Sequence, residues 1–387
     1  MVEKLKVLLI DPWGINNTAE YLNGLISGLS SKTELFVFTN RYFVEQSPSE
    51  AHIFRTFFGI SENMKPNIIR KVIRGLEYSF TYKKIISYLK KHRMDVVHIN
   101  WLLNYKADIR NLRRIKKLSN KIVYTAHNVL PHTNGDASKE ELREIYSIVD
   151  KIIVHGENIK SEMIELFPDT GEKIYVQKHG AIIKEPPFPD NNVLNSEIIE
   201  KCKKYSKILL YCGLIFPNKG VARLAKIWIK SFSSSDALLI IGGRQTDNYP
   251  EYDQIKSSFS KLENTVLIDG YIPDKVLEAL FTVCSVVILP YEHASMSGVV
   301  FSAAQYKKTL ISTNVGSIPE YLENGSDSFV CDNSNEGISQ ALQTVLSMDD
   351  SELSKMGIRL NQNILYKCDW DNICSGIINQ TYKESYE

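Results

Sequence analysis

The sequence predicts an α/β protein with two domains. Its 387 residues exceed the length of one typical domain. Short apolar runs alternate with stretches of helical periodicity along the chain, which is the pattern of repeated strand and helix units. A stretch that contains three prolines and then a charged helix, residues 181–205, is the expected linker between two series of such units.

The composition is ordinary for a soluble globular protein, with 43% hydrophobic and 24% charged residues and a net charge of +1. The charge is unevenly divided, because residues 1–190 carry 28 Lys and Arg against 22 Asp and Glu, and the remainder carries 18 against 23. The six cysteines show no metal-type pair, so we expect reduced thiols. The chain starts without a cleavable signal and has no apolar run near the roughly 18 residues of a membrane span, which predicts a cytoplasmic protein.

The N-terminal half opens with a strand at residues 7–10, a loop containing Gly14 and a helix with regularly spaced apolar residues. The next strand is expected at 35–39, and residues 40–65 are predicted to be irregular. Ligands of open parallel sheets collect beyond the carboxyl ends of the strands. Gly14 therefore has two interpretations, a tight strand–helix turn or a backbone that contacts a ligand.

Residues 65–93 predict a pair of basic amphipathic helices. Nine of these residues are Lys or Arg, Glu77 is the only acid, and apolar side chains are interleaved among them. Such a face attracts anionic lipid headgroups at about 1 kcal/mol per cation near the surface. The alternative is the solvated outer face of two core helices. Nucleic acid is not an expected partner, because no nucleic-acid-binding motif accompanies the charge.

Polar side chains follow a second predicted strand of the N-terminal half. The strand at residues 121–125 leads into His127, Asn128 and His132. A histidine is often structural, but one that follows a buried strand directly is well placed for a site.

The C-terminal half contains a candidate phosphate pocket. An apolar run at residues 284–289 is followed by Ser297 and Gly298, which precede a helical stretch from Val299. Free N–H groups and the positive end of the dipole at a helix N-terminus attract anions, although many such starts are simple N-caps. Upstream, Lys219 lies in a Lys-Gly loop after a buried strand, where an ammonium group supplies a point charge for a phosphate.

With these motifs the chain resembles the retaining glycosyltransferases of family 4, which have the GT-B fold of two Rossmann-like domains facing across a cleft. The resemblance covers almost the whole chain and is strongest at residues 120–160 and 205–320. Residues 314–320, Asn-Val-Gly-Ser-Ile-Pro-Glu, match the end of the family's donor-sugar signature, but its usual pair of acidic residues is missing. The segment is similar to a branch with Pro-Tyr and then Ser-Gly-Val, in which backbone N–H groups bind the donor phosphates.

The resemblance implies an acceptor-side domain, residues 1–190 with a returning helix at 369–387, and a nucleotide-sugar domain, residues 191–368. The implied reaction moves a sugar from UDP or GDP to a hydroxyl of a glycan or lipid-linked acceptor, with retention and without a cofactor. The expected location is the cytoplasm, including the inner face of an anionic membrane. Two alternatives remain open, a sugar-nucleotide epimerase of the same fold and a non-catalytic relative that has lost the acidic pair.

The resemblance also assigns roles to individual residues. His127 is expected at the reaction centre. The expected donor-phosphate ligands are Lys219, Ser297, Gly298, Val299 and Arg244, the last in place of an arginine that is usual before the lysine. The expected nucleotide contacts are Gly213, Tyr271, Ile272 and Glu320, and the acceptor or sugar contacts are Gly14, Asn128 and His132. We expect no metal site. The segment Asp369-Trp370-Asp371 has the Asp-X-Asp pattern of a metal-binding motif, but it lies in the returning helix, far from the expected phosphate ligands.

Overall fold

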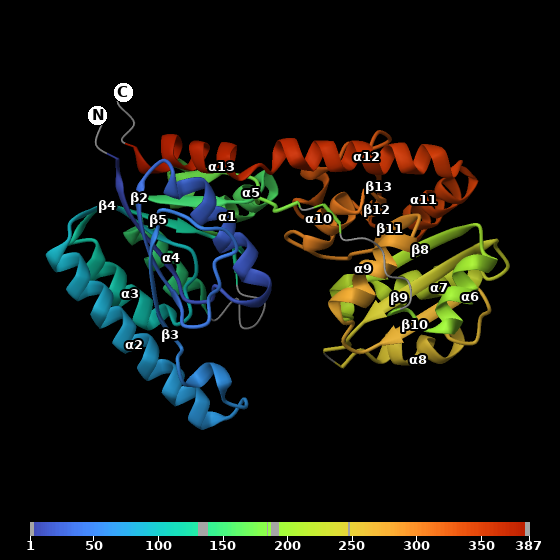
Figure 1. Cartoon of the computed structure of the whole chain (residues 1–387), viewed down its shortest axis with the longest axis horizontal. Helices are drawn as coiled ribbons and strands as arrows, with labels where there is room; N and C mark the ends of the chain where they lie inside the picture. Colours follow the sequence, from blue (N-terminus) through green and yellow to red (C-terminus); the bar gives the residue numbers. More distant parts are fainter. Residues whose placement is uncertain (1–3, 131–137, 184, 187–192, 247, 384–387) are drawn as a thin grey trace. The chain divides into compact units, whose positions relative to one another are not determined.

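The computed structural model describes residues 4–130, 138–183, 185–186, 193–246 and 248–383. The chain forms two compact units. Unit 1 contains residues 1–182 together with 368–387, and unit 2 contains residues 183–367. Each unit is a Rossmann-like parallel sheet covered by helices (Figure 1), as the sequence predicted.

Unit 1 is built on a seven-stranded parallel sheet in the order β3-β2-β1-β4-β5-β6-β7. All neighbouring strands are parallel, so their carboxyl ends lie along one edge, and the strand order reverses between β1 and β4. The central strands are nearly continuous apolar runs, because helices cover both faces. The strands are Lys6–Asp11 (β1), Glu34–Asn40 (β2), His52–Phe57 (β3), Met94–Ile99 (β4), Ser119–Thr125 (β5), Lys151–Val154 (β6) and Ile174–Val176 (β7).

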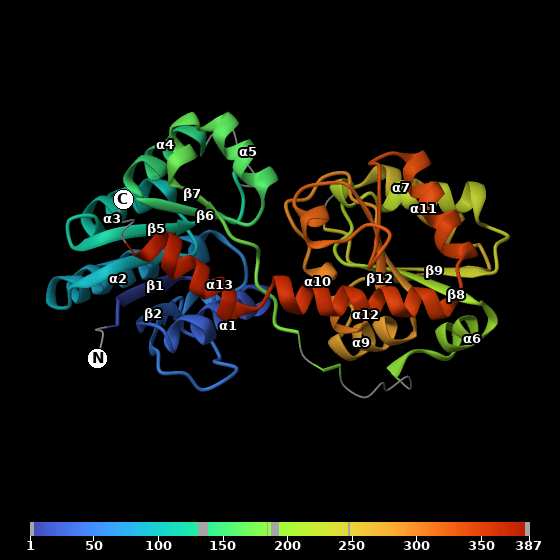
Figure 2. The same cartoon turned by 90° about the horizontal axis from the view of Figure 1, so that it is seen from above.

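Two apolar clusters form the core of unit 1, one on each face of the sheet. The first packs the sheet against α2, α3, α4 and α5, and the second packs it against α1 and α13. Figure 2 shows α13 running beside α1. The helices are Ala19–Ser30 (α1), Ile68–Lys91 (α2), Tyr105–Ile115 (α3), Lys139–Ile148 (α4), Glu157–Leu166 (α5) and Trp370–Ile377 (α13).

The contact between α1 and α13 joins residues that are far apart in the sequence. A Cβ atom at Gly24 of α1 would lie 1.9 Å from the Trp370 ring, so only glycine allows this approach. Asp369 caps α13 by accepting a hydrogen bond from the Asn372 N–H at 2.9 Å, and Asp371 pairs with Lys32. Both acids of the metal-like motif therefore have structural partners.

Two predictions for unit 1 are wrong. Residues 65–93 contain the single helix α2 instead of a pair, since Gly75 in its interior costs only about 1 kcal/mol relative to alanine. Residues 40–65, predicted to be irregular, contain the strand β3. This strand lies at the edge of the sheet and keeps polar residues such as His52 and Arg55, so its sequence lacks the continuous apolar run of the central strands.

Unit 2 is built on a six-stranded parallel sheet in the order β10-β9-β8-β11-β12-β13, which reverses between β8 and β11. The strands are Lys207–Cys212 (β8), Ala237–Gly243 (β9), Thr265–Asp269 (β10), Val286–Leu289 (β11), Thr309–Thr313 (β12) and Phe329–Cys331 (β13). The helices are Ser196–Lys204 (α6), Val221–Ser231 (α7), Pro250–Phe259 (α8), Asp274–Val283 (α9), Gly298–Gln305 (α10), Asn335–Ser347 (α11) and Asp350–Lys367 (α12). No helix in the described ranges has the length and apolarity to cross a bilayer.

Candidate functional site

Three polar side chains form a hydrogen-bonded chain at the carboxyl edge of the unit 1 sheet. Asp11 ends β1, Asn100 follows β4 and His127 follows β5, and these three strands are neighbours. The Asn100 amide donates to Asp11 at 2.5 Å, and its carbonyl oxygen lies 3.0 Å from His127 Nε2. Asp11 also accepts the backbone N–H of Gly14 at 3.0 Å. The structure thus links two predicted site residues, Gly14 and His127, through two that were not predicted.

This chain determines the tautomer of His127. Asn100 uses its amide N–H to reach Asp11, so the oxygen that faces the histidine must accept a hydrogen from Nε2, and Nδ1 becomes an acceptor. The ring stacks on Trp101 with centroids 4.0 Å apart and 6° between the planes. Burial holds the pKa of His127 well below its usual value. At neutral pH, His127 is therefore a neutral and oriented hydrogen-bond acceptor.

Further histidines, buried or half-buried, surround this group. The Tyr21 ring lies 4.9 Å from His127, 5.5 Å from His155 and 4.6 Å from His179 between centroids. Burial lowers the pKa of His155 to about 4 and that of His179 to about 3. His98 on β4 is also buried, and its pKa is lowered to about 3. Four histidines of unit 1 thus fold in the neutral form.

Acidification from about pH 6 to pH 4.5 should destabilise unit 1. The folded pKa values of the four histidines lie below the unfolded value near 6.5, so each binds a proton on unfolding and its contribution to stability is lost as the pH falls. Buried Asp11 and Asp108 oppose this effect, because burial raises their pKa to about 6 and they bind protons in the fold. The unfolded unit therefore binds about two more protons than the folded unit in this window. The free energy of unfolding should fall by about 3 kcal/mol for each pH unit of acidification.

Denaturant titrations of a Trp228→Phe variant measure this effect, because Trp13, Trp101 and Trp370 then report on unit 1 alone. A further His98→Gln substitution removes one titrating group and should reduce the slope by about 1.4 kcal/mol per pH unit. An unfolding free energy of unit 1 that does not change with pH in this window would show that the histidines are protonated in the fold.

Lys219 lies at the carboxyl edge of the unit 2 sheet, in the loop that joins β8 to α7. Its Nζ is 3.8 Å from the centroid of the Tyr291 ring, and burial lowers its pKa to about 8. Within the part of the chain that the structure describes, no carboxylate pairs with this ammonium group. A cation that is partly removed from water and has no anionic partner favours an anionic ligand.

Tyr291 connects Lys219 to the N-terminus of α10. Its hydroxyl lies 3.0 Å from Oγ of Ser297, which is the N-cap residue. Ser297 makes no side-chain capping bond, and the N–H groups of Gly298 and Val299 are too early in the helix to bond within it. The predicted phosphate ligands of the Lys-Gly and Ser-Gly-Val motifs are thus brought together around one aromatic ring.

Two glycines hold the loops of this site against each other. Gly220 has φ +64°, and a Cβ there would lie 1.9 Å from the Pro290 carbonyl oxygen. Gly316 has φ +56°, and a Cβ there would lie 1.8 Å from the Ala294 carbonyl oxygen. Only glycine accepts both the left-handed backbone and the close contact. The loops after β8, β11 and β12 therefore pack backbone against backbone.

The other predicted nucleotide ligands lie along the same edge. Gly213 follows β8, Arg244 follows β9, Tyr271 and Ile272 follow β10, and Glu320 lies in the short helix Ile318–Tyr321 after β12. The Arg244 carbonyl accepts the Ile215 N–H at 2.9 Å, which joins it to the start of the Lys219 loop. Its side chain is exposed.

Sequence reasoning missed Asp11, Asn100 and Tyr291. Asp11 is the last residue of β1, Asn100 follows β4 and Tyr291 lies two residues after β11. Position at the end of a buried strand, the signal that indicated His127, could therefore have indicated these three residues as well. Asn128 follows His127 and is half-buried. His132 lies outside the described residues.

Both halves of the chain match families of sugar-transferring enzymes. A family model described as "Glycosyl transferases group 1" matches residues 206–348, and one described as "Glycosyltransferase Family 4" matches residues 25–182. Both halves of the chain thus match glycosyltransferase families, and the chain has the GT-B fold. Its two parallel-sheet units correspond to the two halves of that fold, as the resemblance implied.

Solved GT-B structures cover nearly all of the chain at low identity. HepE of Anabaena in complex with UDP is 13% identical with a TM-score of 0.69, and the match covers 97% of this chain and 99% of HepE. Sucrose-phosphate synthase of Thermosynechococcus elongatus is 13% identical with a TM-score of 0.71, and the match covers 97% and 98%. These similarities establish the fold.

A curated relative of the chain is the GPI3 subunit of phosphatidylinositol N-acetylglucosaminyltransferase from Saccharomyces cerevisiae. It is 24% identical over 257 residues, which cover 63% of this chain and 53% of the relative. The chain therefore spans about half the length of the curated relatives that it matches.

Proposed function

We propose that this protein transfers a sugar from a nucleoside diphosphate sugar to a hydroxyl group of an acceptor, with retention at the anomeric carbon. The observation that carries the proposal is the environment of Lys219. Its partly buried ammonium group has no carboxylate partner among the described residues, and Tyr291 joins it to the open N-terminus of α10. This combination suits a diphosphate, the leaving group of such a reaction.

Lys219 and the N–H groups of Gly298 and Val299 would stabilise the charge that develops on the leaving diphosphate. Fixed donors aimed at developing charge are worth more in a site with little water than in solution. The unit 2 loops are held by backbone contacts at Gly220 and Gly316, so these donors are in place before the donor sugar binds. In this branch of the family, with its Ser-Gly-Val segment, they would act without the usual acidic pair.

His127 would contact the transferred sugar. Its neutral ring presents Nδ1 as an acceptor, and the bond to Asn100 and the stack on Trp101 prevent the ring from turning. A sugar hydroxyl is a suitable donor for this atom. Asp11 would act through Asn100 as a positioning residue for His127, and the adjacent Gly14 loop would approach the sugar or acceptor.

The relatives favour a uridine donor and a lipid-linked acceptor. HepE has been solved with UDP and with UDP and glucose, and the curated relative is named for N-acetylglucosamine transfer to phosphatidylinositol. We propose by analogy a UDP-sugar as donor and a phosphate-linked lipid as acceptor.

A thermal-shift comparison of UDP and GDP, followed by a transfer assay with the preferred nucleotide sugar, tests the proposal. Binding of a ligand to the folded protein should raise its melting temperature. Sugar release that requires an acceptor supports a transferase. Conversion of the nucleotide sugar without any acceptor would indicate an epimerase, and failure to bind either nucleotide would indicate a non-catalytic protein.

We further propose that α2 binds the surface of an anionic membrane. Ile69, Val72, Leu76 and Phe80 form an apolar stripe on its exposed side, and each is between 56% and 66% exposed. The opposite side of the same helix packs into the core, so the helix is apolar on two faces. Lys71, Lys83 and Lys84 on the same helix, and Lys65 just before it, are also exposed. Exposed apolar and basic residues together suit lipid headgroups over an acyl layer.

Serine substitution of both Leu76 and Phe80 should weaken binding to vesicles of phosphatidylcholine with 30% phosphatidylserine by roughly a hundredfold. Burying one large apolar side chain contributes about 1.5–3 kcal/mol. Co-sedimentation measures the change, and binding of the unmodified protein should also decrease as salt shortens the Debye length.

Serine substitution of Leu365 and Tyr366 on α12, which are also exposed, is the matched control and should have no effect. Equal vesicle binding by the two double variants would exclude the α2 stripe.

A further inference from the structure

A pocket of about 480 Å³ opens beside the first turns of α2 in unit 1. Three of the side chains that line it are cations, and none is acidic. The lining residues are Trp13, Pro66, Asn67, Ile68, Arg70, Lys71 and Arg74. Neither the His127 chain nor the Lys219 site uses these cations.

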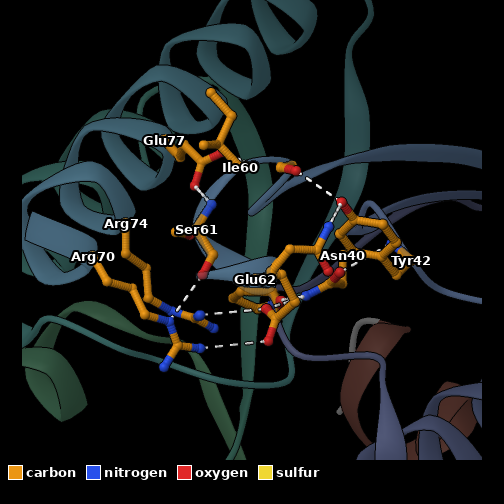
Figure 3. Close-up of polar contacts among 11 residues, drawn as sticks. Asn40, Tyr42, Ile60, Ser61, Glu62, Arg70, Arg74 and Glu77 are labelled. Carbon is orange, nitrogen blue, oxygen red and sulfur yellow. Dashed lines mark hydrogen bonds and ion pairs between the residues drawn. The ribbon is translucent and has the colours of Figure 1, made fainter. Parts of the chain in front are cut away.

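The two arginines of the pocket are held in place by the protein. Arg74 lies over the Trp13 ring at 4.8 Å, and its Nη1 is 3.3 Å from the Glu62 carboxylate. Arg70 donates from Nε to the Ser61 carbonyl at 2.8 Å, and its Nη2 is 3.7 Å from the same carboxylate. Figure 3 shows both side chains turned toward Glu62. Groups that are fixed before binding lose little freedom when a ligand arrives.

The charge of this cluster is not balanced. Two guanidinium groups share the single carboxylate of Glu62, and Arg74 Nη2 is buried without a hydrogen-bond acceptor. The other nearby acid, Glu77, accepts the backbone N–H groups of residues 60 and 61 (Figure 3). Exposed Lys71 has no acidic partner within the described ranges. The pocket therefore retains positive charge and an unused buried donor.

We propose that this pocket binds the phosphate group of a lipid-linked sugar acceptor. Guanidinium groups bind phosphate through paired hydrogen bonds, and the Nη2 amino group of Arg74 has no hydrogen-bond acceptor in the described part of the protein. All residues of this pocket belong to unit 1, whereas Lys219 belongs to unit 2. This inference rests on the proposed function and adds the chemistry by which the acceptor is recognised.

A second pocket places the acceptor's sugar next to its phosphate. Gly14 and Ile15, which follow Trp13 directly, line this pocket of about 460 Å³. Its polar side chains suit sugar hydroxyls, and they are Asn16, Tyr42, Gln46, Glu62 and Asn63. Glu62 lines the second pocket and pairs with the arginines of the first, so the two pockets share a wall. A phosphate-linked sugar spans such a pair of pockets.

The apolar rim identifies the phosphate as that of a lipid. Ile68 lines the first pocket and is 72% exposed, and the apolar stripe of α2 continues from it through Ile69 and Val72. A phosphate joined to an acyl or prenyl chain contacts both the cations and this stripe, whereas free phosphate contacts the cations alone.

Calorimetric titration of the full chain with dihexanoyl phosphatidic acid, below its micelle-forming concentration, tests the assignment. The Arg74→Gln variant should bind this lipid at least tenfold more weakly. The Lys71→Gln variant, which changes an exposed side chain, should bind it severalfold more weakly and covers the case in which Arg74→Gln does not fold. Arg113→Gln is the matched control, because Arg113 is an exposed arginine that pairs with Glu144 away from the pocket, and it should bind normally.

Unchanged lipid affinity in both Arg74→Gln and Lys71→Gln would overturn the assignment of the pocket. Inorganic phosphate that binds as tightly as the lipid would overturn the lipid-linked part. UDP titrated into the same variants should bind as to the unmodified protein, since the donor site lies in unit 2. The unmodified protein could also neither bind UDP nor transfer a sugar, while its lipid binding still depends on Arg74. That result would reject the proposed activity and keep the assignment of the pocket.

Discussion

Substitution of Lys219 by alanine should lower turnover about a hundredfold while the protein folds normally. The side chain carries no ion pair among the described residues, and it is partly buried over the Tyr291 ring, so its removal leaves no carboxylate without a partner. Losing a donor that stabilises charge developing on the leaving diphosphate costs about 2–4 kcal/mol in the transition state. Steady-state transfer from the preferred nucleotide sugar measures the effect, with circular dichroism to verify folding.

Lys230→Ala is the matched control, because Lys230 is an exposed lysine on the following helix α7. It should leave turnover unchanged. If Lys219→Ala keeps the turnover of the unmodified protein, the ammonium group does not contact the leaving group, and the phosphate assignment of the Lys-Gly loop is wrong.

Substitution of His127 by alanine should lower turnover by roughly ten- to a thousandfold and leave the affinity for the nucleoside diphosphate nearly unchanged. The proposed diphosphate ligands all lie in unit 2, whereas His127 belongs to unit 1 and is proposed to contact the sugar. An interaction made mainly in the transition state affects turnover without affecting binding of the product nucleotide. Calorimetric titration of the diphosphate beside a transfer assay separates the two quantities.

His127 also stacks on Trp101 and bonds to Asn100, so a structural effect needs its own control. His127→Gln keeps a neutral polar side chain and should retain more turnover than His127→Ala. His52→Ala changes an exposed histidine of the edge strand β3 and should have no effect. Equal losses of diphosphate affinity and turnover in His127→Ala would mean that the histidine supports the fold or the nucleotide site.

The local sequence was sufficient to place the strands and the motifs that follow them. Central strands such as β8 and β9 are continuous apolar runs, and the Lys-Gly and Ser-Gly-Val motifs lie in the loops that follow the buried strands β8 and β11. These features depend on residues close together in the chain, so periodicity reveals them. The same periodicity failed at β3, since an edge strand does not need an apolar run, and at α2, since one glycine does not end a long packed helix.

Contacts between distant residues were decided by the tertiary structure. The bond from Asn100 to Asp11 crosses 89 positions and sets the tautomer of His127, and the Arg74 to Glu62 pair forms only because β3 and α2 bring the two together. The sequence showed that residues 65–93 are basic and apolar, but only the fold shows that Arg70 and Arg74 turn inward to Glu62 while the apolar stripe faces outward. The physical reason is that local spacing determines where a side chain lies on its own helix or strand, whereas burial, charge balance and pKa depend on which other elements pack against it.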